Sequence, residues 1–264
     1  MDKVIIVGTY EFIGFQLCLS LLEQGREVVG IHLKTNSKDP FLEEKRFEIG
    51  RNSNFTEQDE SYFDSFEPLA YPMILFIDYY SYYFKREEKK LSSVINTNFL
   101  KKYSFHFILT IPLQLIHEKD SIELPLFQKS DKECTPSIFY LPTVYGPWQP
   151  MKYVFQQAMN NPNGPISLDD REWTEDVLYI DDVMSIIVKE LEAKEKKVYL
   201  LKSKIEDHWK KISSLLVGES QIETHRHKLK SFSQDITVLH VGDTEPQDGI
   251  ENQKRHLARL KKIW

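Results

Sequence analysis

Short apolar runs alternate with longer apolar-periodic stretches from the first residues of the chain onward. Residues 4–7 and 28–33 are runs rich in β-branched side chains, which predict two buried strands. Apolar residues crowd the stretch 12–23 between them, which predicts a helix with little polar face. Gly8 and Gly14 flank the start of this helix. The order strand, glycine turn, helix, strand is the usual opening of a dinucleotide-binding fold.

The same alternation continues along the rest of the chain. Residues 34–46 are predicted as a loop or broken helix, 46–49 as a short third strand, and 50–68 as a short helix with loops. Strands that alternate with helices predict an α/β, Rossmann-type, doubly wound and mostly parallel sheet, with its ligand crevice at the carboxyl ends of the strands. Further strands are predicted over 73–78, 105–111, 137–141, 198–201 and 236–240, and helices over 87–103, 152–159, 180–192, 207–217 and 253–263.

The length of 264 residues suits one such sheet with a smaller lobe beside it. We expect residues 1–146 and 176–197 to form the Rossmann-like nucleotide-binding core. Residues 147–175 and 198–264 are expected to form a small C-terminal lobe of the substrate-binding type. An apolar fraction of 41% is sufficient to pack both parts.

Charge and cysteine usage exclude several classes of partner. The net charge is −6, and charge runs such as residues 85–90 mix both signs, so we expect no nucleic-acid partner. No apolar run approaches the length of a membrane span, and a strand begins almost at the first residue, so we expect a cytoplasmic protein with no membrane partner and no signal peptide. Cys18 and Cys134 form no C-x-x-C pair, and His225 and His227 lack a third ligand at metal-binding spacing, so no metal site is predicted.

Four stretches carry a resemblance to a known family. They are residues 4–33 with Phe-Ile-Gly at the end of the glycine loop, Tyr145-Gly146-Pro147, residues 174–183 with the sequence TEDVLYIDDV, and residues 198–201. In this order along the chain they resemble the extended short-chain dehydrogenase/reductase family, of the NAD-dependent epimerase/dehydratase type. The resemblance implies a Rossmann core and a bound NAD or NADP.

The implied cofactor site departs from the family in its glycine loop. The family pattern is G-x-x-G-x-x-G, whereas Glu11 stands at the middle glycine here. A carboxylate at this position crowds and repels the phosphates, or acts as their mimic by neutralising the helix N-terminus itself. Gly8 and Gly14 would then serve only the turn and the packing of helix on strand. The resemblance places the cofactor on Gly8, Tyr10, Glu11, Phe12, Ile13, Gly14, His32, Lys34, Tyr79, Thr110 and Thr143.

Two further segments leave alternatives open. NAD-dependent members carry an acidic residue at the end of the second strand, where this chain has His32, with Lys34 two residues on. These basic groups favour the 2′-phosphate of NADP, or they are exposed loop residues without a ligand. Four tyrosines at 79, 80, 82 and 83 follow the strand at 73–78. They stack on a nucleotide base or on a partner protein, or they fill the crevice that a cofactor would occupy.

The catalytic pattern of the family is missing. Its members use Tyr-x-x-x-Lys on a helix after the fifth strand, in which the tyrosine exchanges a proton with substrate and the lysine lowers the tyrosine pKa. No tyrosine occurs between Pro112 and Phe139, and Thr110 is the hydroxyl at the strand end. The lysines of this stretch, Lys119, Lys129 and Lys132, have no tyrosine at the required spacing.

We therefore assign no catalytic residue and expect a catalytically degenerate member that acts as a nucleotide-sensing, binding or regulatory protein. One alternative is an active NAD(P)-dependent reductase or epimerase with relocated groups, for which His106, Thr110, Tyr79 and Tyr80 are the candidates. Another is an interaction scaffold that binds no cofactor. The corresponding partners are a nucleotide ligand, a protein partner or a second copy of the chain.

Overall fold

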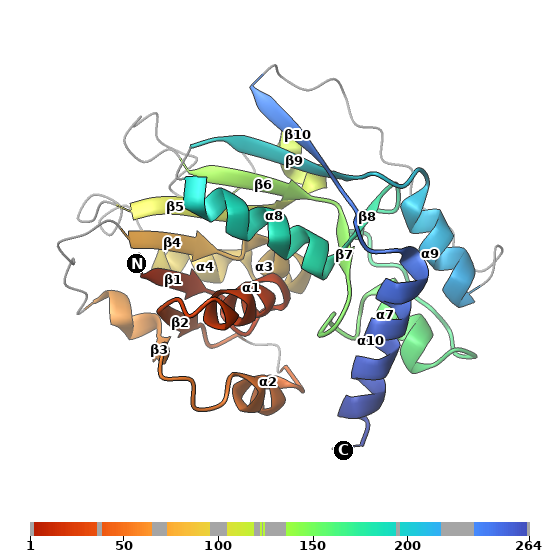
Figure 1. Cartoon of the computed structure of the whole chain (residues 1–264), viewed down its shortest axis with the longest axis horizontal. Coiled ribbons are helices and arrows are strands. Elements are labelled where there is room, and N and C mark those ends of the chain that lie inside the picture. Colours follow the sequence, from red (N-terminus) through yellow and green to blue (C-terminus); the bar gives the residue numbers. More distant parts are fainter. Residues whose placement is uncertain are drawn as a thin grey trace.

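Eight parallel strands form one sheet, and helices cover both of its faces (Figure 1). The structure is a computed structural model that describes residues 3–35, 39–64, 73–95, 105–118, 122, 124, 136–193, 196–217 and 235–262. The strands of the sheet are β1 (Val4–Val7), β2 (Val28–His32), β3 (Phe55–Asp59), β4 (Met73–Ile77), β5 (Phe105–Pro112), β6 (Ser137–Leu141), β9 (Val198–Ser203) and β10 (Ile236–Val241). Their order is β10-β9-β6-β5-β4-β1-β2-β3, and β7 (Thr143–Tyr145) pairs separately with β8 (Val177–Tyr179). The prediction of a Rossmann-type parallel sheet is confirmed.

Two hydrophobic cores lie on opposite faces of the sheet. Val4 and Ile6 point to the face that carries α1 (Phe12–Glu23) and α8 (Ile180–Ala193), which also pack against each other. Ile5 and Val7 point to the face that carries α3 (Tyr79–Lys85), α4 (Glu88–Val94) and the 3₁₀-helix η2 (Leu113–His117). Because all four strand residues are fully buried, β1 runs through the centre of the molecule, and its carboxyl end opens onto the glycine turn.

A lobe of three helices lies at the carboxyl ends of the strands (Figure 1). It consists of α7 (Val154–Asn160), α9 (His208–Val217) and α10 (Pro246–Leu260), which contact one another. The buried Gln253 of α10 donates hydrogen bonds to Oε1 of Gln149 (2.9 Å) and to Oε1 of Gln156 (2.7 Å). We expected residues of β9 and β10 in this lobe, but β9 pairs with β6 and β10 pairs with β9, so both strands extend the main sheet.

Four expectations for local structure are wrong or incomplete. Residues 46–49 are not a strand but belong to α2 (Leu42–Ile49). The third strand is β3, whose polar sequence FTEQD gives no apolar signal because it lies at the sheet edge and pairs only with β2. It is followed by the 3₁₀-helix η1 (Glu60–Phe63), and α10 begins seven positions earlier than predicted, at Pro246. Of the helix predicted over 87–103, the structure describes α4, and residues 96–103 lie outside the described part.

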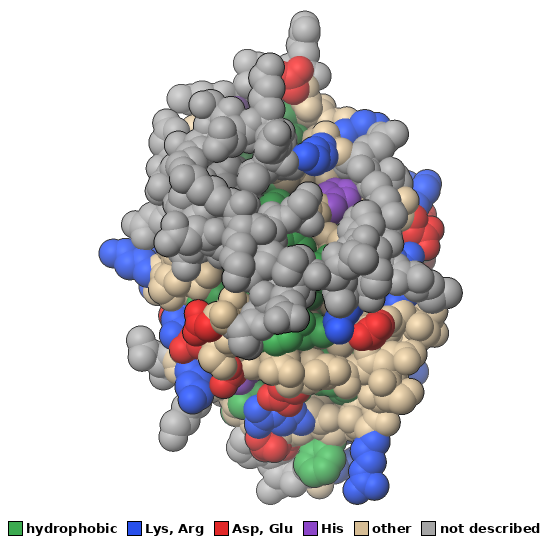
Figure 2. Space-filling model, turned by 90° about the vertical axis from the view of Figure 1, so that its left-hand side faces the viewer, with side chains coloured by type: hydrophobic (Ala, Val, Ile, Leu, Met, Phe, Trp, Pro, Cys, Tyr) green, Lys and Arg blue, Asp and Glu red, His purple; other side chains and the backbone are tan. Residues whose placement is uncertain are grey.

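The surface at the amino ends of the strands carries both signs of charge among the described residues (Figure 2). Lysine, arginine, aspartate and glutamate side chains are interspersed there. This distribution is typical of a solvated protein face. In the described residues, no helix has the length and apolar character needed to cross a membrane.

Candidate functional site

The glycine turn at the carboxyl end of β1 depends on contacts within the protein. Gly8 has φ +89°, a conformation that favours glycine, and its N–H donates to the carbonyl of Ile31 (3.1 Å). A Cβ on Gly14 would lie 2.2 Å from the carbonyl oxygen of Gly8. Glycine at both positions is therefore required by the close approach of α1 to the turn, whether or not a ligand is bound.

Asp78 occupies the space between the start of α1 and the start of α3. Its fully buried carboxylate accepts hydrogen bonds from the N–H of Gly14 (2.8 Å) and from the N–H of Ser81 (2.9 Å). The hydroxyl of Thr110 lies 3.4 Å from the same carboxylate, and the N–H of Ile13 donates to Oγ of Ser81 (3.4 Å). Two N-terminal amides of α1 thus have protein acceptors. Burial raises the pKa of Asp78 to about 6.

Glu11 and Lys85 form an ion pair beside the first turn of α1. The Nζ of Lys85 lies 2.7 Å from Oε1 of Glu11, and the Glu11 side chain is only 7% exposed. Glu11 has extended backbone angles (φ −76°, ψ 165°), so a side chain is accommodated without strain at the position of the family's middle glycine. The ring of Tyr82 also approaches this turn, since its Cε2 would lie 3.0 Å from a Cβ on Gly8.

These contacts do not fit the diphosphate of a dinucleotide. That group needs free N–H donors at the helix start and an approach without a competing negative charge. Here the amides of Ile13 and Gly14 already have acceptors, and a buried carboxylate lies at the first turn. The glycine turn keeps its geometry, but the protein's own Glu11 and Asp78 supply the negative groups near the helix N-terminus.

A cavity of about 350 Å³ lies at the carboxyl end of β2. His32, Lys34, Thr35, Tyr10 and the Glu11–Lys85 pair contribute to its lining. The Tyr10 hydroxyl donates to Glu57 (2.8 Å), and the Tyr10 ring meets His32 edge-on with 5.5 Å between centroids. Burial lowers the pKa of His32. Since Lys34 is exposed, it is the predicted basic group that a ligand reaches most easily.

A second cavity of about 360 Å³ also borders the Glu11–Lys85 ion pair. Phe12 of α1, Lys45 of α2 and the segment 148–152 line it together with residues 39–41. Lys45 is 4% exposed and bonds both the carbonyl of Tyr10 (2.6 Å) and Oδ2 of Asp39 (2.7 Å). The two cavities share Glu11, Asp39, Pro40 and Lys85 in their linings.

The remaining predicted cofactor contacts are buried and face protein groups. Tyr79 is 2% exposed and belongs to the core on the α3 and α4 face. The hydroxyl of Thr143 donates to the carbonyl of Trp173 (2.6 Å), and Thr110 bonds Asp78. Tyr79 and both threonines are therefore part of the packed interior in this structure.

The candidates for relocated catalysis are also held internally. The Tyr80 hydroxyl donates to the carbonyl of Pro142 (3.1 Å) and accepts from the N–H of Val144 (3.1 Å). His106 Nε2 lies 3.0 Å from Oγ of Ser137, away from the glycine turn. After β5 the structure describes η2, whereas Lys119, Lys129, Lys132 and Cys134, like His225 and His227, lie outside the described residues.

Several residues around the two cavities escaped sequence reasoning. Lys85 and Lys45 are ordinary helix-surface residues by pattern, and Asp78 looks like a strand-end capping group. Trp148 follows Gly146-Pro147 and has φ +67°, which no local sequence rule for a bulky side chain anticipates. Asp78 and Lys85 reach the glycine loop only through tertiary contacts, since Asp78 pairs with Gly14 across 64 positions and Lys85 pairs with Glu11 across 74.

Solved structures share this architecture over nearly the whole chain. The dTDP-glucose 4,6-dehydratase of Bacillus anthracis, solved in complex with NAD, has a TM-score of 0.67 at 11% identity, covering 100% of this chain and 99% of that one. Pal from Bacillus thuringiensis has a TM-score of 0.66 at 12% identity, covering 98% and 99%. The UDP-glucose 4-epimerase of Thermotoga maritima, solved with UDP-glucose, has a TM-score of 0.57 at 16% identity, covering 98% and 99%. The chain has the fold of the NAD-dependent epimerases and dehydratases. The resemblance read from the four sequence stretches is confirmed at this level.

Sequence comparison adds one relative. The uncharacterized protein YjaV of Bacillus subtilis (strain 168) is 24% identical over 151 residues, which cover 56% of this chain and 65% of that protein. The match thus spans less than two thirds of the relative's length. No family model matches the chain.

Proposed function

We propose that this chain is a non-catalytic binding protein built on the epimerase/dehydratase fold, in which the protein's own side chains replace the dinucleotide phosphates. The observation that carries the proposal is the Glu11–Lys85 pair at the first turn of α1. The missing Tyr-x-x-x-Lys pattern supports the absence of turnover. The buried partners of Tyr80 and Thr110 support it as well.

The electrostatics of the turn favour the protein carboxylate over a phosphate ligand. A diphosphate would have to separate Glu11 from Lys85 and then lie beside the displaced carboxylate in a largely buried site. A glycine at position 11, as in the family pattern, has no carboxylate to repel the diphosphate and no ion pair that must be broken. Without the Glu11 carboxylate beside it, the charged amine of Lys85 would instead attract phosphate.

We expect the substitution Glu11→Gly to create dinucleotide binding. In calorimetric titrations with NAD, NADH, NADP and NADPH, the variant should bind at least one form at least tenfold more tightly than the original chain, about 1.4 kcal/mol. The physical reason is that the change removes the competing charge, frees Lys85 and restores close approach to the helix N-terminus. Glycine tolerates the extended backbone angles of position 11, so the fold is retained.

Two matched variants separate charge from space in this test. Glu11→Gln keeps the bulk and removes the charge, so it should show a smaller gain than Glu11→Gly. Adding Lys85→Met to Glu11→Gly should remove most of the gain, because the cation is lost. Dinucleotide binding by the original chain that equals the Glu11→Gly variant would contradict the proposal, as would NAD(P)-dependent turnover of any epimerase or reductase substrate.

A dinucleotide sensor is the second candidate, and the cavity at the end of β2 is the observation that favours it. Its lining contains His32 and Lys34, the two basic residues expected to meet a 2′-phosphate. In this case the original chain would bind NADP more tightly than NAD, and Lys34→Met would abolish the preference. The same titration series therefore separates the two functions.

A further inference from the structure

The cavity beside the segment 148–152 has the size of a small-molecule site. Its volume of about 360 Å³ falls within the range in which proteins enclose ligands. It is bounded by Phe12 at the start of α1, by the turn at residues 39–41 and by Trp148 and Lys152. The residues that line the cavity are far apart in the sequence and come together only in the folded structure.

Five charged side chains line this cavity, and four of them pair with one another. Glu11 pairs with Lys85 at 2.7 Å, and Asp39 pairs with Lys45 at 2.7 Å. Lys152 is the fifth; among the described residues its Nζ makes no hydrogen bond or ion pair, although Asp169 and Glu172 interact with it electrostatically at longer range. The lining therefore carries one positive charge that its own residues leave uncompensated.

Most of the charged groups that act on Lys152 are cationic. Its side chain is partly buried, and burial together with Arg86, Arg171 and Lys85 lowers the pKa of Lys152, while Asp169 opposes the shift. Asp169 itself is engaged by Arg86 at 3.2 Å. An anion placed next to the Lys152 amine would stabilise its charged form.

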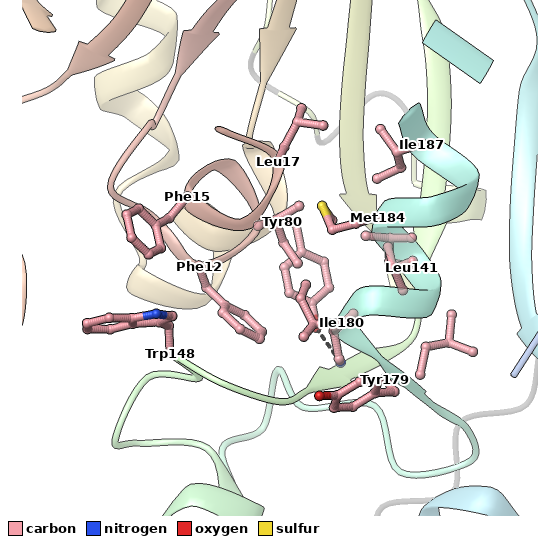
Figure 3. Packing of buried hydrophobic residues seen from close by; sticks show 14 of the residues in the cluster. Phe12, Phe15, Leu17, Tyr80, Leu141, Trp148, Tyr179, Ile180, Met184 and Ile187 are labelled. Carbon is pink, nitrogen blue, oxygen red and sulfur yellow. Dashed lines mark hydrogen bonds between the residues drawn. The ribbon is translucent and has the colours of Figure 1, made fainter. Parts of the chain in front are cut away.

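The other walls of the cavity are apolar and aromatic. Phe12, Phe41 and Trp148 provide the rings, joined by Pro40, Pro150 and Met151. The Trp148 ring packs edge-on against Phe41 at 6.2 Å between centroids, and Figure 3 shows Trp148 lying beside Phe12 at the start of α1.

We propose that this cavity binds a small, flat, apolar monocarboxylate, with the carboxylate on Lys152 and the ring among Phe12, Phe41 and Trp148. The inference deepens the proposed binding role and rests on it, because it names the ligand class. One uncompensated cation matches one negative charge. A diphosphate would bring at least two negative charges next to Glu11 and Asp39, and a neutral ligand would leave the Lys152 charge without a partner.

The test is calorimetric titration of the full chain with naphthalene-2-carboxylate. Naphthalene-2-carboxamide serves as the neutral probe of the same shape, and inorganic phosphate as the anion without a ring. We expect the carboxylate to bind at least tenfold more tightly than the amide, and phosphate at the same concentration to leave its binding unchanged. Equal binding of carboxylate and amide, or no binding of the carboxylate, would overturn the inference.

Substitutions of Lys152 test whether its amine is the group that binds the carboxylate. Lys152→Met should weaken carboxylate binding at least tenfold and remove the preference over the amide, whereas Lys152→Arg should keep the preference. Lys254→Met, an exposed lysine on α10, is the matched control and should change nothing. Unchanged binding in Lys152→Met would also overturn the inference. Failure here leaves the dinucleotide titrations and turnover assays unaffected, so it is distinguishable from failure of the proposed function.

Discussion

The substitution Gly14→Ala should lower the free energy of unfolding by about 4 kcal/mol, near the upper end of single-residue effects. The added Cβ would lie 2.2 Å from the carbonyl oxygen and 2.9 Å from the carbonyl carbon of Gly8. Both are backbone atoms, so no side-chain rotation relieves the clash. Either α1 or the turn after β1 has to move.

Movement of α1 has a second consequence. The N–H of Gly14 donates to the fully buried carboxylate of Asp78 at 2.8 Å, and a shifted helix would lengthen this bond. A buried carboxylate that loses a donor is destabilised, because no solvent replaces the hydrogen bond. The clash with Gly8 and the weakened hydrogen bond to Asp78 therefore both destabilise the folded Gly14→Ala variant.

Urea denaturation followed by circular dichroism measures the effect. Ser20→Ala, later in the same helix, is the control, and we expect it to change the unfolding free energy by less than about 0.5 kcal/mol. A loss below about 1 kcal/mol for Gly14→Ala would show that the turn adjusts easily and that the glycine is not kept for packing.

The amino-terminal part of the fold follows from local sequence signals. The helix at residues 12–23 and the strands around it were predicted within one residue, since apolar density and glycine positions depend on short segments. The third strand was missed because FTEQD lies at the sheet edge, where pairing on one side needs no apolar pattern.

The site was predicted less completely because its defining contacts join distant segments. Glu11 was recognised as a departure from the family's glycine loop, yet its partner Lys85 is 74 positions away and has no local signature. The family resemblance placed Thr110 and Thr143 on the cofactor. Their acceptors, Asp78 and the carbonyl of Trp173, are visible only in three dimensions.

Buried carboxyl groups make the stability of this protein depend on pH. Burial raises the pKa of Asp78 and of Asp176 to about 6 and that of Glu172 to about 8. A carboxyl whose pKa is raised in the folded state binds more protons there than in the unfolded chain. The free energy of unfolding therefore falls as the pH rises from the pKa of the carboxyl in the unfolded chain to its pKa in the folded protein. Because the pKa of Glu172 is the highest of the three, this residue extends the fall to a higher pH than the two aspartates do.

The window between pH 6.5 and 8 isolates Glu172. The aspartates have lost most of their protons at pH 6.5, and burial lowers the pKa of His208 and of His256 to about 4, so these histidines are neutral in the folded state and lose their remaining unfolded-state charge in the lower part of the window. One proton difference changes the unfolding free energy by about 1.4 kcal/mol per pH unit. Because Glu172 is half deprotonated at pH 8 and the histidines offset part of the effect, we expect the original chain to lose about 1 kcal/mol across this window.

The substitution Glu172→Gln should remove that loss and leave the unfolding free energy nearly constant from pH 6.5 to 8. Glutamine keeps an oxygen that accepts the N–H of Val154, the bond that Glu172 makes at 3.2 Å, and it carries no proton to lose. Glu175→Gln, at an exposed neighbouring position, should retain the original pH profile. Urea denaturation at half-unit pH intervals measures all three proteins. Parallel profiles for Glu172→Gln and the original chain would contradict the prediction, because they would mean that Glu172 does not release its proton within this pH window in the folded protein.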